Sequence, residues 1–262
     1  MHKIKTIIRK EWAEVFKNRM VIFSVLFMPL LFTAIPLIFL YTMRGSGLTD
    51  MSSELPAQFT QMCREGLSGS DCFRVYMVSQ FILLYMMIPL IIPVNIAAYS
   101  IVGEKTTRSL EPLLATPITT AELLIGKNLS AVIPAVLATW LGFGLFAAGA
   151  SLLVENRLVL LSFLDTLWLL AIFLVGPLLA VLSVNFSIMV SSRVNDPRVA
   201  EQMSAIVIVP VLGLFFGQIA GFILLDSRIV LIMAAVVLLI DALMVYLAVR
   251  LFQRESILTR WK

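Results

Sequence analysis

The chain has 262 residues, of which 60% are hydrophobic and only 14% are charged. Soluble domains contain about 45–50% apolar and about 25% charged residues, so this composition excludes a soluble enzyme and predicts an integral membrane protein. The net charge of +4 does not indicate nucleic acid binding, because the Lys and Arg residues are placed as in a membrane-orientation signal.

Residues 1–19 are predicted to form a helix that precedes the first membrane span. Six apolar residues fall on one face of that helix at α-helical spacing, namely Ile4, Ile7, Ile8, Trp12, Val15 and Phe16. The Lys and Arg residues fall mostly on the other faces. A basic amphipathic helix of this kind lies in the membrane interface, attracted to anionic headgroups. Packing on a soluble domain is the alternative, but the chain offers no such domain.

Six apolar segments are each long enough to cross a hydrocarbon core of about 30 Å, which takes about 20 helical residues. We predict spans at 20–43, 76–102, 131–154, 164–190, 205–225 and 229–252. Most of the Lys and Arg residues lie before span one, between spans two and three, between spans four and five, and after span six. Because cytoplasmic segments carry this excess, both termini are expected in the cytoplasm. The expected fold is a single all-α transmembrane domain over 1–262.

The connection between spans one and two is expected outside and contains the only two cysteines, Cys63 and Cys72. A disulfide between them is plausible in an oxidising compartment. Two free thiols in an external loop are the alternative, because sequence spacing does not determine disulfide geometry.

Seven prolines lie within the predicted spans, and each removes one backbone hydrogen bond and kinks its helix. Pro89 and Pro93, followed by Asn95, predict a distorted second span. A ridge of small residues that allows close helix packing is predicted in span five, formed by Gly213, Gly217 and Gly221.

The polar connection between spans two and three, residues 104–127, reads EKTTRSLEPLLATPITTAELLIGK. A short helix is predicted to begin near Ser109, because Pro112 fits only in a first helical turn and the helix dipole favours Glu111 there. The helix is predicted to end at Thr116-Pro117, since the residue before a proline avoids the α conformation.

This short helix has one apolar face, formed by Leu110, Leu113 and Leu114. Such a face could rest on lipid, or it could fill a groove on a soluble partner, and the residues alone do not separate the two. Thr119 and Glu122 then form a capping box that starts the helix leading into span three.

Polar residues inside the spans are candidate functional residues. Asp241 lies near the middle of span six, where a charged Asp costs about 2.5–3.5 kcal/mol, so we expect it to face the bundle. It is either a proton or cation site, or a neutral acid hydrogen-bonded to a neighbouring helix. Asn95, Asn185 and Gln218 are uncharged and more often join helices. No catalytic residue and no metal site are predicted, because the single histidine, His2, is terminal.

Several motifs resemble type-2 ATP-binding-cassette exporter permeases. The connection matches the coupling segment of that family at Glu104-Lys105, Leu110-Glu111, Leu113-Leu114, Thr116-Pro117, Glu122 and Gly126-Lys127, and departs from it at Arg108 and Ser109, where Gly-Thr is usual. The opening, with Lys10-Glu11, Asn18-Arg19 and Pro29, and the tail at 252–262 are similar to the NatB-like branch.

The resemblance implies an exporter subunit in a prokaryotic inner membrane rather than an enzyme. Two permease chains, identical or related, would form the substrate pathway, and separate cytoplasmic ATPase subunits would bind ATP and Mg and dock on the coupling helices. The residues that the resemblance assigns to this docking are Glu104, Leu110, Glu111, Leu113, Leu114, Thr116 and Pro117. The chain lacks a Walker A loop, since Gly126-Lys127 is followed by Asn128 and residue 121 is Ala.

Other functions stay open from the residues alone. An ion channel or secondary transporter could use Asp241 without nucleotide, and a membrane-bound scaffold would need neither. A companion ATPase would distinguish the first reading from these two. The transported substrate is not specified by any motif in the chain.

Overall fold

The computed structural model describes residues 2–43, 67, 69–106 and 119–251. This described part is helical and contains no strand, which confirms the predicted all-α class. The elements are α1 (His2–Val15), α2 (Arg19–Met43), α4 (Gly69–Ser79), α5 (Ile82–Thr106), α7 (Thr120–Leu153), α8 (Arg157–Phe163), α9 (Thr166–Leu169), the π-helical turn η2 (Leu170–Val175), α10 (Gly176–Arg193), α11 (Pro197–Ser204), the 3₁₀ turn η3 (Ala205–Ile208), α12 (Val209–Ile219) and α13 (Ser227–Leu251).

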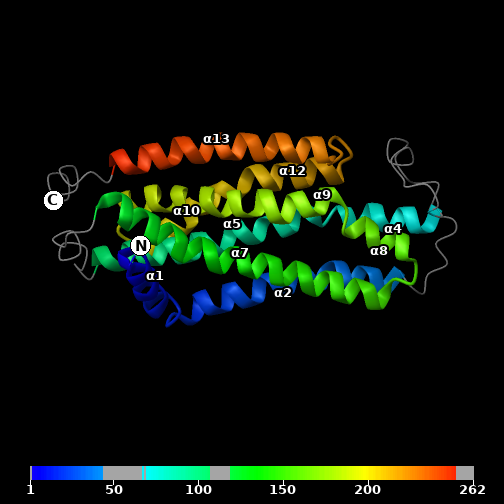
Figure 1. The fold of residues 1–262 in the computed structure, drawn as a ribbon, viewed down its shortest axis with the longest axis horizontal. Coiled ribbons are helices and arrows are strands. Elements are labelled where there is room, and N and C mark those ends of the chain that lie inside the picture. The colour runs from blue at the N-terminus through cyan, green and yellow to red at the C-terminus, as the bar shows by residue number, and fades with distance from the viewer. Residues whose placement is uncertain (1, 44–66, 68, 107–118, 252–262) are drawn as a thin grey trace.

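Six helical stretches among the described residues are long and apolar enough to cross a membrane, as predicted. The first, third and sixth are the single helices α2, α7 and α13, whereas the other three are built from several segments. The second consists of α4 and α5, the fourth of α8, α9, η2 and α10, and the fifth of α11, η3 and α12. Figure 1 shows the spans side by side in one long bundle, with α1 at one end and α4 and α8 at the other.

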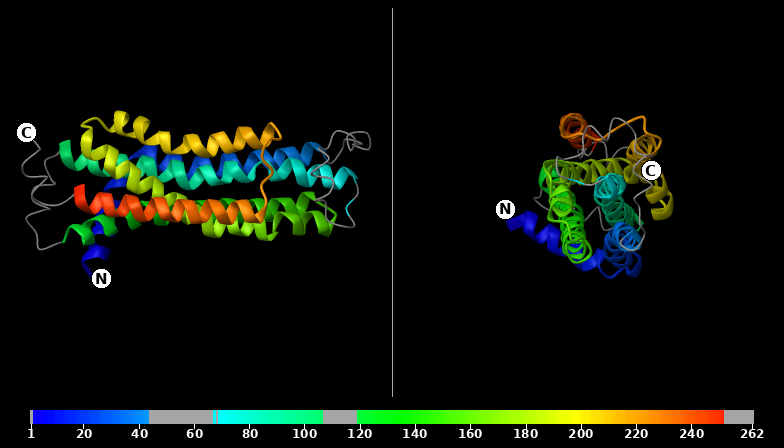
Figure 2. Two further views of the ribbon diagram at one scale, coloured as in Figure 1. Left: turned by 90° about the horizontal axis from the view of Figure 1, so that it is seen from above. Right: turned by 90° about the vertical axis from the view of Figure 1, so that its right-hand side faces the viewer.

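Helix α5 lies in the middle of this bundle. It packs against α2, α7 and α10, and the end-on view in Figure 2 shows these helices around it. The ring of Tyr85 on α5 is fully buried, and its centroid lies 5.9 Å from those of Phe146 and Trp168. Aromatic pairs at this separation contribute beyond the area that they bury. The aromatic cluster therefore joins spans two, three and four.

Side-chain caps set the starts of three helices. At α7, Thr119 Oγ1 accepts a hydrogen bond from Glu122 N at 3.2 Å, and Thr119 N donates to Glu122 Oε2 at 2.9 Å, which confirms the predicted capping box. Asn156 caps α8 and Asp196 caps α11 by accepting bonds from the backbone two residues on. Because of the capping box, α7 begins at Thr120, well before the apolar stretch predicted to span the membrane.

The second span is discontinuous, but the break does not lie at its prolines. Pro89 and Pro93 are inside the continuous helix α5, whereas α4 ends and α5 begins on either side of Gln80–Phe81. The hydroxyl of Ser183 on α10 donates to the carbonyl of Leu90 at 2.6 Å. A neighbouring helix thus donates a hydrogen bond to α5 one residue after Pro89, and α5 is continuous through both prolines.

The fifth span ends earlier than the sequence predicts. Helix α12 stops at Ile219, and Gly221 has a φ of +76°, the left-handed conformation that suits a glycine just after a helix. Phe222 N donates to the Gly217 carbonyl at 2.9 Å and closes the helix end. The predicted three-glycine ridge is therefore wrong at Gly221, which terminates α12 instead of extending its packing face.

Candidate functional site at the α1 end of the bundle

Helix α1 packs on the two helices that flank the predicted coupling segment. Its buried residues Ile7, Glu11 and Val15 are spaced four apart and so form one stripe, and α1 contacts α7 and α5. Next to this stripe, the indole Nε1 of Trp12 donates to the Ser130 carbonyl at 2.8 Å. The predicted interfacial helix is thus part of the packed bundle, and its position in a membrane interface stays a prediction.

The packing of α1 on α7 explains why position 126 is a glycine. A Cβ at this position would lie 2.7 Å from Ile7 Cγ2 and 2.9 Å from Ile7 Cβ, closer than carbon atoms approach. A glycine therefore lets the branched Ile7 side chain lie directly on the backbone of α7. The glycine of the Gly126-Lys127 pair thus serves the contact between α1 and α7.

Three polar side chains from α1, α5 and α7 meet inside this contact, and we call Glu11, Ser100 and Lys127 the Glu11 cluster. Lys127 Nζ donates to Glu11 Oε1 at 2.9 Å and to Ser100 Oγ at 2.8 Å. Ser100 Oγ in turn donates to Glu11 Oε2 at 2.5 Å. The side chains of Glu11 and Lys127 are only 2% and 6% exposed. Each charged group is therefore both paired and hydrogen-bonded in a buried site.

The cluster is electrostatically consistent with an ionised pair. Burial alone would raise the pKa of the Glu11 carboxyl, but the Lys127 ammonium, the Ser100 hydroxyl and the nearby Lys10 together hold that pKa below its usual range. Lys10 Nζ lies 3.9 Å from Glu11 Oε1. Removing one member of a buried ion pair leaves an uncompensated charge, which costs about 3–5 kcal/mol. The buried ion pair and its hydrogen bonds therefore hold the three helices together, and breaking them costs substantial free energy.

Two members of the cluster, Ser100 and Lys127, lie in the helices that precede and follow the predicted docking segment. Ser100 belongs to α5, which ends at Thr106, and Lys127 belongs to α7, which begins at Thr120. The segment between these two helix ends, residues 107–118, lies outside the described residues. Of the predicted docking residues, Leu110, Glu111, Leu113, Leu114, Thr116 and Pro117 fall in that segment. Glu104 is in the last turn of α5, where only its backbone is described.

Sequence reasoning did not identify the Glu11 cluster as a site. The apolar stripe predicted for residues 1–19 left Glu11 out, although Glu11 lies midway between the buried Ile7 and Val15 at helical spacing. That spacing was the signal available: a carboxylate on the buried face of a short helix needs a basic partner. Nothing in the local pattern identified Lys127 as that partner.

The polar residues predicted within the spans are placed separately from this cluster. Asp241 is 5% exposed and lies on the same stripe of α13 as the buried Val230, Ala234 and Val237. The stripe side of α13 packs against α10 and η2. Neither carboxylate oxygen of Asp241 has a hydrogen-bond partner among the described residues. Asp241 therefore faces the bundle and not its outer surface.

Of the three predicted amides, two join neighbouring helices and the third is half-buried. Asn185 on α10 is buried and accepts a hydrogen bond from Asn128 Nδ2 on α7 at 3.0 Å, so it connects spans three and four. Asn95 is half-buried in α5. Gln218 Nε2 donates to the Ser79 carbonyl at 3.4 Å, which connects spans five and two.

The two cysteines cannot both be placed. Cys72 is buried near the start of α4, and no thiol is free among the described residues. Cys63 lies outside them, so its disulfide with Cys72 stays a prediction. Within the same described ranges, no group of His, Cys, Asp and Glu residues is arranged to hold a metal ion.

The comparison with protein families gives one match that covers nearly the whole chain. A family model described as ABC-2 family transporter protein matches residues 5–250. The match includes most of α1, all six spans and the three residues of the Glu11 cluster. The comparison with curated proteins gives no match.

Proposed function

The chain belongs to the ABC-2 transporter family, and from that premise we propose that it is an export permease driven by a separate ATPase that docks on residues 104–127. As a member of this family, the chain is a multi-pass membrane permease subunit of an ABC transporter. ATP and Mg would be bound by the partner. The NatB-like motifs favour a prokaryotic inner membrane as the location.

One observation carries the proposal: the Glu11 cluster ties both ends of the docking segment to α1. Residues 107–118 join the end of α5 to the start of α7, so a push on them is passed along the chain to those two helices. Lys127 Nζ bonds both Ser100 and Glu11 within 2.9 Å. Because breaking this buried network is costly, the three helices should move as one body when the segment is displaced.

The proposed cycle follows from this rigid connection. ATP binding draws two ATPase subunits together and tilts the segment docked on each. The tilt passes through α5, the central helix of the bundle, and through α7 to the rest of the spans. Hydrolysis and release reset the position. A second permease chain, identical or related, would complete the pathway, and the Lys and Arg distribution would place both termini on the ATPase side.

The proposal is tested by isolating the chain with its natural partners. The tagged chain would be purified from its native membranes in lipid nanodiscs, and the sample analysed for a co-purifying nucleotide-binding subunit and for Mg-dependent ATP hydrolysis. We expect a stoichiometric ATPase whose rate is higher with the permease than alone. A chain that purifies without any ATPase, and transports without nucleotide, would contradict the proposal.

One observation favours a second candidate. Asp241 has both carboxylate oxygens buried and without a hydrogen-bond partner among the described residues. A carboxylate in this position inside a membrane bundle often marks an ion or proton path. An ion-conducting or secondary transport function that uses Asp241 without nucleotide is therefore the alternative, and it requires transport that persists when ATP is absent.

A further inference from the structure

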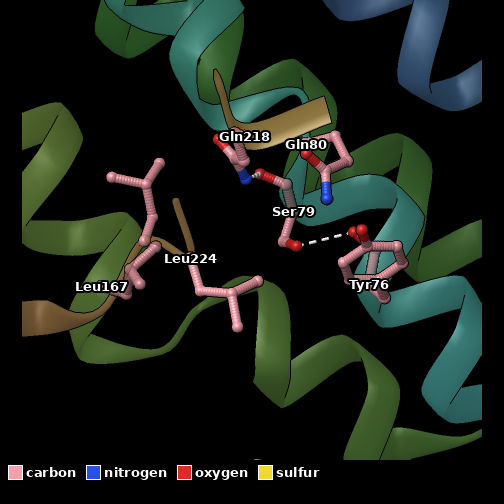
Figure 3. Close-up of a pocket in the computed structure, with 7 residues that line it drawn as sticks. Tyr76, Ser79, Gln80, Leu167, Gln218 and Leu224 are labelled. Carbon is pink, nitrogen blue, oxygen red and sulfur yellow. Dashed lines mark hydrogen bonds between the residues drawn. The ribbon is translucent and has the colours of Figure 1, made fainter. Parts of the chain in front are cut away.

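Breaks in three spans converge on one small cavity at the end of the bundle away from α1. The cavity has a volume of about 30 Å³. Three parts of the bundle line it: the break in span two, the first turn of α9 in span four, and the end of span five with its link to α13. The lining residues are Tyr76, Ser79 and Gln80 from the first part, Leu167 from the second, and Gln218, Leu224 and Leu225 from the third. Figure 3 shows these side chains around it, with Gln218 and Gln80 on one side and Leu167 and Leu224 on another.

Two buried glutamines bring polar atoms without protein partners to this cavity. Gln80 is 8% exposed and Gln218 is 3% exposed. Among the described residues, neither Nε2 nor Oε1 of Gln80 has a hydrogen-bond partner, and Oε1 of Gln218 also lacks one. The remaining amide group, Gln218 Nε2, donates to the Ser79 carbonyl at 3.4 Å. The cavity therefore faces one amide donor and two amide acceptors whose hydrogen bonds are unmet.

We propose that this cavity is a binding site for an ordered water molecule that bridges Gln80 and Gln218. A cavity needs about 10–15 Å³ and two to four polar partners to hold a water, and both conditions are met here. A buried amide left without hydrogen bonds destabilises the folded chain. A water that donates to Gln218 Oε1 and accepts from Gln80 Nε2 satisfies two of the three unmet amide atoms, one on each residue.

The unpaired amide atoms of Gln80 and Gln218 also determine what kind of molecule the cavity can bind. A cation would satisfy the two amide oxygens but not the Gln80 NH₂ donor. An anion would satisfy the donor but not the oxygens. None of the described side chains that line the cavity is charged, so none compensates an ion of either sign, and an uncompensated buried ion is costly. A neutral guest that both donates and accepts is required, and the volume fits water.

The position of this water has a structural consequence. Gln80 lies in the break between α4 and α5, and Gln218 lies in the last turn of α12. Irregular backbone within a membrane bundle persists only where its polar groups are satisfied by protein or by water. The bridging water would therefore hold span two to span five at the point where both lose regular helical structure.

Radiolytic footprinting in ¹⁸O-labelled water tests the site on the full chain in nanodiscs. Tyr76 lines the cavity and is 7% exposed, whereas Tyr85 is 0% exposed and packs in the aromatic cluster with Phe146 and Trp168. We expect ¹⁸O incorporation at Tyr76 to be several-fold faster than at Tyr85. In the double variant Gln80→Leu/Gln218→Leu, which removes the polar partners of the water, the Tyr76 rate should fall to that of Tyr85.

Thermal unfolding gives an independent test. If the cavity is dry, replacing its glutamines with leucine should raise the Tm, whereas loss of a bound water should lower it. Gln80→Leu and Gln218→Leu should each lower the Tm by about 2–4 °C, and the double variant should lose less than the sum because the two residues share one water. The matched control is Gln202→Leu at an exposed position of α11, with little change expected. A rise in Tm for both single variants, with Tyr76 labelled as slowly as Tyr85, would overturn the proposal. So would a Tm that rises with Na⁺ or K⁺ but not with choline, because it would show a cation in the site.

Discussion

Lys127 Nζ lies 2.9 Å from Glu11 Oε1 inside the contact between α1 and α7, with both side chains almost completely buried. Along the chain, Glu11 precedes the first span and Lys127 follows the second. Ser100 from α5 completes the network. An ion pair taken out of water is retained only when its geometry and hydrogen bonds are good. Here it joins the N-terminal helix to both helices from which the docking segment departs.

The first prediction concerns the stability of this pair. Glu11→Gln should lower the free energy of unfolding by about 3–5 kcal/mol, because it leaves the Lys127 ammonium buried without a counter-charge. The double variant Glu11→Leu/Lys127→Leu should lose less than Glu11→Gln does, since no buried charge remains. Denaturant unfolding of the full chain in nanodiscs measures both.

The control for this prediction is the exposed pair at the same helix contact. Lys3 Nζ lies 3.5 Å from Glu122 Oε2 with both side chains substantially exposed. Lys3→Gln should therefore change the stability by no more than about 1 kcal/mol. Equal losses of unfolding free energy for Lys3→Gln and Glu11→Gln would show that the buried Glu11–Lys127 pair contributes no more stability than the exposed pair.

The second prediction concerns pH. The pKa of Glu11 in the folded chain is held below its ordinary value, chiefly by Lys127 once the opposing effect of burial is overcome. A carboxyl with a depressed folded pKa contributes stability that is present above its unfolded pKa, about 4.3, and is lost as the pH falls through the folded value. The Tm difference between wild type and Glu11→Gln should stay constant from pH 7 to about pH 5 and shrink below that. A difference that instead grows as the pH falls would contradict the assigned ion pair.

The third prediction concerns the glycine beside this cluster. Gly126→Ala should destabilise the chain by about 1–3 kcal/mol, because its Cβ would overlap Ile7 at 2.7 Å. Gly144→Ala in the same helix is the matched control, since a Cβ there has no atom within 4 Å. The control should be neutral or stabilise by up to about 1 kcal/mol, as alanine favours a helix. Equal effects at the two positions, measured by thermal unfolding, would exclude a tight α1–α7 contact.

The fourth prediction separates the two candidate functions. If Asp241 has a structural role, Asp241→Asn should keep ATP-driven transport and its ion dependence, because Asn preserves the shape and a hydrogen-bonding group. Transport would be measured in inverted vesicles across sodium and proton gradients. Loss of transport, or a changed ion dependence with normal ATPase activity, would favour the ion-path alternative for Asp241.

The long apolar segments made the fold class and the six spans predictable, because a span needs about 20 apolar residues whatever its neighbours are. The Thr119–Glu122 capping box was also predictable, since its partners are three residues apart. The break at Gln80–Phe81 was not, because neither residue is a proline or glycine, and the residues that meet Gln80 at the cavity, Gln218 and Leu167, come from other spans. Pro89 and Pro93 carried the stronger local signal, and yet α5 is continuous through both of them.

The site was predictable only in part, for a related reason. The docking segment was identified from residues adjacent in sequence, which is what motif reasoning detects. The Glu11 cluster depends on Lys127, which is 116 residues from Glu11, and periodicity in one helix does not identify a partner in another. Gly126-Lys127 was recognised only as part of a family motif, whereas the structure gives each residue a physical reason: close approach for Gly126 and charge compensation for Lys127.

The most direct test of the account is whether an ATPase binds at the segment between α5 and α7. The change Leu114→Asp should abolish co-purification of the ATPase and its stimulated ATP hydrolysis, because it places a charge on the apolar face predicted to dock. The same change at Leu152, an exposed position at the opposite end of α7, should leave both intact, and both variants should insert into the membrane at wild-type levels. If Leu114→Asp binds and stimulates the ATPase as well as Leu152→Asp does, the docking site is not where we place it.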